Sequence, residues 1–256
     1  MARLRISRFI ITFLLLSCGT IQASLQSYST GERHWIAART ALPDGNAYTE
    51  LFTRPIAVGA EWKRLTRIGP RVVDLAHRGS DVVAVTDAGN WLIAWAGDVV
   101  YPPRLPDSAS MLEIATSPEG GFWALGETRP SSASTQPVAS ADRADPDRPA
   151  LPAGTRVLYR FGTQSWERVA IVDDALLPRE GRWSLGMLDA RPMLAAVDRH
   201  RVRVILLDSD HRQFSPLPPI ENVSPVRIRL LEDARPSLHV QASDRDTLHV
   251  LVGDDW

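Results

Sequence analysis

A tandem repeat constrains this chain more than any other feature of its sequence. Five times, an apolar residue is followed twelve positions later by a small or β-branched residue inside a second apolar stretch, with a short polar turn between the two. One such unit cannot bury its apolar face alone, so neighbouring copies must stack to form a core. The pairs are Leu25/Ala37, Val72/Ala84, Leu112/Ala124, Trp183/Ala195 and Ile228/Val240.

The apolar stretches have the pattern of β-strands. Val82–Thr86, Val202–Leu206 and Leu248–Val252 are rich in β-branched residues and are bounded by polar turn residues, which is typical of strands. Beyond residue 24 we find no stretch in which apolar residues recur at helical spacing. The sequence therefore predicts an all-β protein.

Each unit divides into four expected strands. In the second unit they are Val72–Ala76, Val82–Thr86, Asn90–Trp95 and Val99–Leu105, and the glycine of Asp87-Ala88-Gly89 suits a tight turn. Prolines follow the fourth strand in the first four units. Because proline is tolerated at sheet edges, we expect the fourth strand to be the outermost one.

Four-stranded units that recur about every 40 to 47 residues, with one longer copy, are typical of a β-propeller. The stretch from Met111 to Gly126 resembles the first hairpin of WD40-type and sensor-type propeller repeats. The Gly-His and Trp-Asp dipeptides of true WD40 repeats are absent, and so is the Trp-bearing motif of quinone-cofactor propellers. The resemblance implies a β-propeller of no specific family, with about five units near 25–68, 72–106, 111–177, 183–220 and 226–256.

Two units depart from the repeat. In the third, a segment rich in Pro, Ser, Ala and Asp (128–154) intrudes between the second and third strands, and we expect it to be disordered. In propellers that resemble this one, such loops lie on the face where ligands commonly dock, although a tolerated surface insertion is the favoured reading. The fifth unit stops at Trp256, where its fourth strand should begin, so we expect a fragment of a longer protein or a sheet that keeps three strands.

Residues 1–24 have the features of an export signal. Arg3, Arg5 and Arg8 precede an apolar stretch that is too short to span a bilayer. Ile21-Gln22-Ala23 offers a cleavage site before Ser24, whereas Leu15 to Gly19 resembles a lipobox in which Cys18 would be lipidated. Cleavage, a lipid on Cys18 and an uncleaved anchor all remain open. We expect an exported protein of the periplasm, cell envelope or extracellular space, with a membrane link through the signal, the lipid or a missing C-terminal segment.

The composition limits the class of partner. A formal net charge of −1 provides no basic field for nucleic acid, so we expect an unidentified protein or glycan ligand. No nucleophile elbow, phosphate-binding loop or zinc-protease segment is present, and we predict no catalytic, cofactor or metal site. Asp74 and Glu113 are the acidic residues that we place on channel-lining first strands, either solvated or salt-bridged to Arg229.

Other chemistry-bearing residues have structural explanations. We expect Asp208 to His211 to form a turn between the third and fourth strands of its unit. His239 and His249 lie on adjacent strands and could face each other. Trp91 and Trp95 could stack on a sugar or cofactor ring, although core packing is favoured.

The leading prediction is a non-catalytic, exported bacterial propeller that acts as a binding or sensing module. The alternative is a carbohydrate-active or redox enzyme whose site is assembled from several units. A third interpretation is a structural lipoprotein of the cell envelope.

Overall fold

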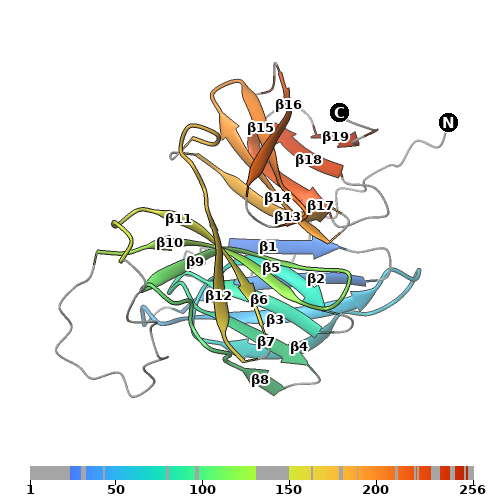
Figure 1. Ribbon diagram of the computed structural model, residues 1–256. Helices are drawn as coiled ribbons and strands as arrows, with labels where there is room; N and C mark the ends of the chain where they lie inside the picture. The colour runs from blue at the N-terminus through green and yellow to red at the C-terminus, as the bar shows by residue number, and fades with distance from the viewer. Residues whose placement is uncertain are drawn as a thin grey trace.

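In the computed structural model, the chain folds into five small antiparallel sheets that form a β-propeller (Figure 1). The structure describes residues 24–29, 33–42, 44–78, 81–95, 98–130, 150–162, 164–178, 181–188, 190–210, 213–221, 223, 225–231, 237–242, 246–250 and 252. For residues 24–29, 95, 226, 227, 231 and 242 it describes the backbone alone. Cys18 and residues 131–149 of the insertion lie outside the described residues.

The first two sheets contain four strands each, in the order of the sequence. Sheet one consists of β1 (Ser24–Ser29), β2 (Arg33–Ala41), β3 (Ala47–Pro55) and β4 (Lys63–Ile68). Sheet two consists of β5 (Val72–Arg78), β6 (Asp81–Thr86), β7 (Trp91–Trp95) and β8 (Asp98–Val100).

The next two sheets repeat this plan, and the fifth is smaller. Sheet three consists of β9 (Ala109–Thr116), β10 (Phe122–Thr128), β11 (Arg156–Phe161) and β12 (Trp166–Ile171). Sheet four consists of β13 (Trp183–Leu188), β14 (Arg191–Asp198), β15 (Arg201–Leu207) and β16 (Phe214–Ile220). Within the described residues, sheet five has three strands, β17 (Pro225–Leu231), β18 (Ser237–Ala242) and β19 (Asp246–Val250).

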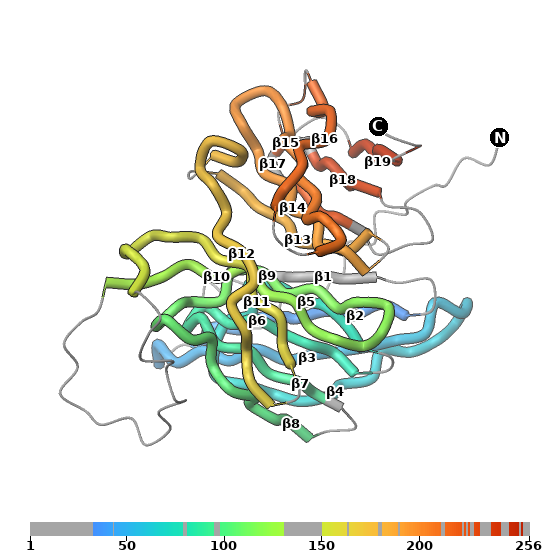
Figure 2. Tube along the Cα trace, in the orientation of Figure 1, coloured from blue at the N-terminus to red at the C-terminus, as the bar shows by residue number. Residues whose placement is uncertain are grey.

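The first strand of every sheet lies toward the centre of the propeller. β1 contacts β5, β5 contacts β9, β9 contacts β13, and β13 contacts β17, and Figure 2 follows the chain through the sheets in this order. The fourth strands β4, β8, β12 and β16 lie at the opposite edges of their sheets. The predicted all-β propeller with outermost fourth strands is therefore confirmed.

Apolar residues fill the space between consecutive sheets. Four buried clusters join sheet one to two, two to three, three to four and four to five. The small residues of the repeat, which lie on the second strand of each sheet, are all at most 2% exposed: Ala37, Ala84, Ala124, Ala195 and Val240. Among the side chains that the structure describes, no such cluster joins sheet five to sheet one.

The structure defines the strand register behind the repeat and corrects one expected strand. The twelve-residue offset is not a cross-strand register, because only Ile228 and Val240 of the five pairs lie directly opposite each other. Bulges in the β5–β6 and β9–β10 pairings and turns of different length shift the other pairs. The fourth strand of sheet two is also shorter than expected, because it ends at Val100 before the prolines that follow.

The described part of the chain has no helix that is long and apolar enough to cross a membrane.

Candidate functional site

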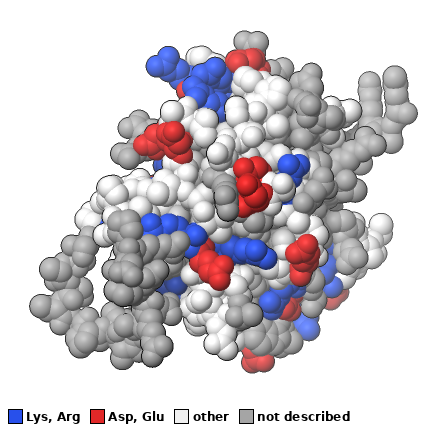
Figure 3. Space-filling model, viewed as in Figure 1, with Lys and Arg blue, Asp and Glu red and all other residues white. Residues whose placement is uncertain are grey.

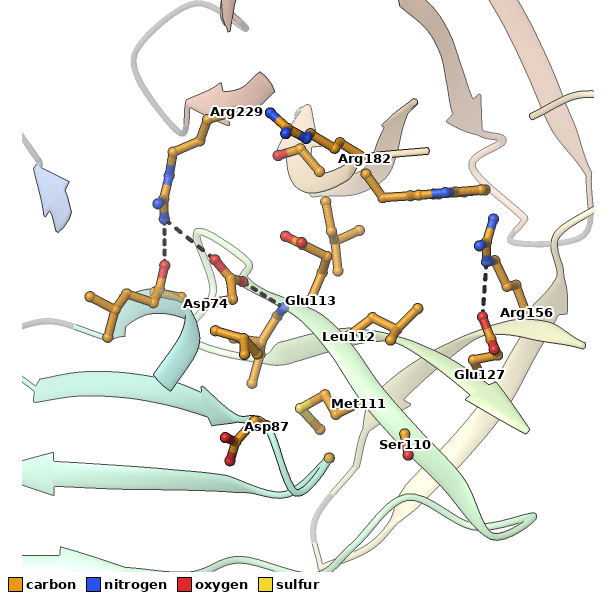
Figure 4. A pocket seen from close by; sticks show the side chains of 18 of the residues that line it. Asp74, Asp87, Ser110, Met111, Leu112, Glu113, Glu127, Arg156, Arg182 and Arg229 are labelled. Carbon is orange, nitrogen blue, oxygen red and sulfur yellow. Dashed lines mark hydrogen bonds and ion pairs between the residues drawn. The ribbon is translucent and has the colours of Figure 1, made fainter. Parts of the chain in front are cut away.

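A cavity of about 560 Å³ lies among the inner strands of the propeller (Figure 4). Its wall is built from the inner strands of four sheets, β5, β9, β13 and β17. Residues just outside these strands complete the rim, including Asp87 and Gly89 before β7 and Arg182 before β13. We call this cavity the axial pocket.

Antiparallel topology explains why residues so distant in sequence meet there. The first strand of a sheet begins, and its second strand ends, at the same end of the sheet. The turns between second and third strands therefore lie at the same end of the ring as the starts of the first strands. Gly89, in such a turn of sheet two, accepts a hydrogen bond from Met111 of β9, with N···O at 3.1 Å.

Gly89 has a positive φ of 74°, which favours glycine. A Cβ there would lie 2.7 Å from Oγ of Ser110, so a larger residue would push the turn away from β9.

Asp74 on β5 connects neighbouring sheets. Its side chain is 11% exposed, and its Oδ2 accepts a hydrogen bond from the backbone N–H of Ile114 on β9 at 3.1 Å. Its Oδ1 lies 3.9 Å from Nη2 of Arg229 on β17. The expected salt bridge to Arg229 is therefore confirmed for Asp74.

Arg229 reaches from sheet five to sheet two. Its guanidinium group donates a hydrogen bond to the backbone carbonyl of Leu75, next to Asp74 (Figure 4). A second polar link joins sheets four and five, where the hydroxyl of Ser184 accepts a hydrogen bond from the N–H of Leu230 at 2.9 Å. Polar side chains thus satisfy backbone groups of the inner strands that have no partner strand on the axial side.

Arg156 and Trp183 form another part of the pocket wall. The guanidinium carbon of Arg156 lies 4.1 Å from the ring centroid of Trp183, within cation–π range. Arg156 also donates to the carbonyl of Pro178 at 3.0 Å and lies 3.4 Å from a carboxylate oxygen of Glu127. With 8% of its surface exposed, Arg156 is fixed by these contacts.

Glu113 and Arg182 also line the pocket. Glu113 lies on β9 between Leu112, which is half-exposed, and Ile114, which binds Asp74. Its side chain extends into the pocket below Arg182 in the view of Figure 4. Arg182 is exposed and precedes β13. The structure thus brings together Asp74, Glu113 and Arg229, which the sequence singled out, and adds Arg156 and Arg182, which it did not.

The remaining sequence expectations have mixed outcomes. His239 lies opposite Leu248, and His249 lies opposite Leu238. Because directly opposite residues share a face of a sheet, the two histidines point to opposite faces, and the expectation that they could face each other is wrong.

Asp208 forms a hydrogen-bonded hairpin with Gln213 between β15 and β16, which confirms the expected turn, although His211 lies outside the described residues.

Trp91 belongs to the core, which is the interpretation that the sequence favours. It is 1% exposed, while the side chain of Trp95 lies outside the described part. No three His, Cys, Asp or Glu side chains of the described residues are grouped closely enough to hold a metal ion.

Charged side chains are distributed without a strong bias on the face seen in Figure 3. Acidic and basic groups alternate there rather than gather into a field of one sign. The axial pocket is likewise balanced, because four arginines and four carboxylates line it: Arg129, Arg156, Arg182, Arg229, Asp74, Asp87, Glu113 and Glu127.

No known family model matches the sequence, and no curated protein matches it. Solved structures do resemble the fold. The acylaminoacyl peptidase of Pyrococcus horikoshii aligns with 91% of this chain and 38% of its own, at 12% identity and a TM-score of 0.51. A GH43_1 enzyme from Xanthomonas citri aligns with 91% of this chain and 89% of its own, at 14% identity and a TM-score of 0.43.

A third solved structure gives a similar match. TolB from Acinetobacter baumannii aligns over 90% of this chain and 68% of its own length, at 8% identity and a TM-score of 0.46. At 12% identity, the likeness to the acylaminoacyl peptidase shows the fold alone and not a function.

Proposed function

We propose that this chain is an exported propeller that binds a ligand in the axial pocket without converting it. The basic and apolar character of residues 1–24 supports export. The balanced polar lining and the volume of about 560 Å³ support a binding site, because ligand pockets commonly measure about 300–1,000 Å³.

The engagement of Asp74 is the observation that carries this proposal. A general acid or base must exchange a proton with the substrate. Both carboxylate oxygens of Asp74 instead face protein donors, the N–H of Ile114 at 3.1 Å and the guanidinium of Arg229 at 3.9 Å. Asp74 therefore acts as a link between sheets two, three and five.

The ligand is a protein segment or a glycan with several polar groups. Charged rims and backbone groups of the inner strands supply donors and acceptors, while Leu112, Met111 and Trp183 supply apolar surface. Such a mixture suits a flexible polar chain that inserts one residue or sugar unit into the opening.

Array binding with a matched pair of variants tests the proposal. Leu112→Trp adds bulk at the pocket wall, while Leu65→Trp adds the same bulk at a half-buried site on β4 outside the pocket. Glycan and peptide arrays are probed with the wild-type domain and both variants. We expect Leu112→Trp alone to lose the array signals; their retention by a folded Leu112→Trp protein would contradict a pocket ligand.

An enzyme remains the second candidate because Asp74 and Glu113 line the same pocket. Incubation with the array-selected ligand, followed by mass spectrometry of the products, distinguishes the two functions. Binding without conversion is the result expected here. Conversion that Glu113→Gln or Asp74→Asn abolishes would establish the enzyme instead.

A further inference from the structure

We infer that the axial pocket recognises a carboxylate group of its ligand and that Arg182 is the anchoring cation. This inference rests on the proposed binding function and adds the chemical class of the ligand.

The backbone of Arg182 is fixed while its side chain is available. Its carbonyl accepts a hydrogen bond from the N–H of Val197 on β14 at 3.0 Å. The preceding Gly181 has a φ of 140°, and an added Cβ would lie 2.8 Å from the carbonyl oxygen of Val197. The turn thus requires glycine and places Arg182 at the pocket rim, where its guanidinium makes no hydrogen bond or ion pair with the described residues.

Two neighbouring arginines are already engaged. Arg229 binds the carbonyl of Leu75 and faces Asp74. Arg156 binds the carbonyl of Pro178, faces Glu127 and lies over Trp183. Of these three arginines, Arg182 is therefore the one whose guanidinium N–H groups can bind a ligand. A guanidinium binds the two oxygens of a carboxylate in a bidentate pair.

Glu113 limits the charge of that acceptor. Its carboxylate lines the same pocket and extends into the opening below Arg182 (Figure 4). A like charge nearby disfavours a dianion such as phosphate more than a single carboxylate.

Both a uronic acid and a peptide C-terminus present this chemistry, so the test uses two matched pairs of probes. D-glucuronate is compared with D-glucose, and N-acetyl-alanyl-alanine is compared with its C-terminal amide. Affinities are measured by NMR titration of the purified protein. We expect the acid of at least one pair to bind at least about ten-fold more tightly than its neutral partner, because hydrogen bonds to charged groups are the stronger ones. The preferred pair identifies the source of the carboxylate.

Three variants assign the anchor. Arg182→Gln should reduce acid binding about ten-fold or more. Arg104→Gln, at an exposed position outside the pocket, should leave it unchanged. Arg129 also lines the pocket, and loss of binding in Arg129→Gln with full binding in Arg182→Gln would overturn the assignment of the anchor.

Glu113→Gln provides a second measurement. This variant should raise the affinity for inorganic phosphate toward the affinity for the preferred acid, because the repelling negative charge of Glu113 is removed. Equal binding of the acid and neutral probes by the wild-type domain would overturn the carboxylate inference and leave the binding function standing. Failure of the Leu112→Trp array test would instead overturn the binding function.

Discussion

Sheets two and three meet through an apolar interface, whereas sheets two and five meet across the axis through polar groups. In the first contact, Trp91 packs edge-on against Phe122, Phe161 and Trp166, at centroid distances of 5.1, 5.5 and 5.1 Å. In the second, Arg229 bridges to the carbonyl of Leu75 and to Asp74.

The difference shows how a small ring can be both stable and hollow. Apolar packing between consecutive sheets supplies burial free energy, so it can hold the ring without filling the axis. Polar side chains then satisfy the inner backbone edges and leave space for a ligand. The apolar contact sets stability, and the polar contact shapes the site.

Removal of Trp91 should have the largest effect. Trp91→Ala deletes a 1% exposed side chain and its hydrogen bond to the carbonyl of Pro103 at 2.8 Å. We expect the free energy of unfolding to fall by about 3–5 kcal/mol, measured by urea denaturation. Tyr101→Ala, at a position 58% exposed, is the control and should change it by less than about 0.5 kcal/mol; equal effects would contradict the role of the aromatic interface.

Gly186 tests the close approach of inner strands β13 and β17. A Cβ at this position would lie 2.5 Å from Cβ of Leu230, so Gly186→Ala must push the two strands apart. We expect a loss of about 1–3 kcal/mol in the same denaturation experiment. Gly162→Ala, where the nearest contact is the end of the Glu167 side chain at 3.3 Å, should cost less; the reverse order would show that the strands separate without penalty.

The polar contact across the axis should contribute less. Arg229→Met removes the donor to Leu75, and water in the open pocket can replace it, so we expect a loss of about 0.5–1.5 kcal/mol. A double-mutant cycle with Asp74→Asn should give a coupling free energy below about 1 kcal/mol, because the ion pair is long at 3.9 Å. A larger coupling would mean that the ion pair, rather than the bond to Leu75, links the sheets.

The smallest effect concerns His34 in sheet one, outside both regions. Burial, with a further contribution from Arg54, lowers the pKa of His34 below its usual 6.5. The unfolded chain therefore binds the proton more readily, and stability should fall as the pH drops below about 6.5. Thermal melts from pH 7.5 to 5 should show a smaller decrease for His34→Gln than for the wild type; identical decreases would place the titration elsewhere.

The sequence predicted the fold well because each sheet is encoded locally. Ala84 and Ala124 reveal where the second strands must leave space, and the turn at Asp87-Ala88-Gly89 marks the hairpin beside them. Register was less predictable, because the bulges that shift the pairing between β5 and β6 leave no signal in the spacing of apolar residues.

The site was only half predictable. Asp74 and Glu113 were recognised because they lie on first strands, which must line the axis. Arg182 and Arg156 were missed because the residues around them follow no repeating pattern. Arg182 directly precedes β13, and Arg156 is the first residue of β11. Their positions could have been inferred from topology, since the start of a first strand and the start of a third strand lie at the same end of a sheet.

Hydrogen exchange with mass spectrometry, with and without an array-selected ligand, tests the central claim most directly. We expect added protection in segments 73–76, 110–114 and 182–185, which line the axial pocket. We expect no change in the outer strands β4, β8, β12 and β16. Protection confined to the outer strands, with the inner segments unchanged, would contradict the claim that this propeller binds its ligand at the axis.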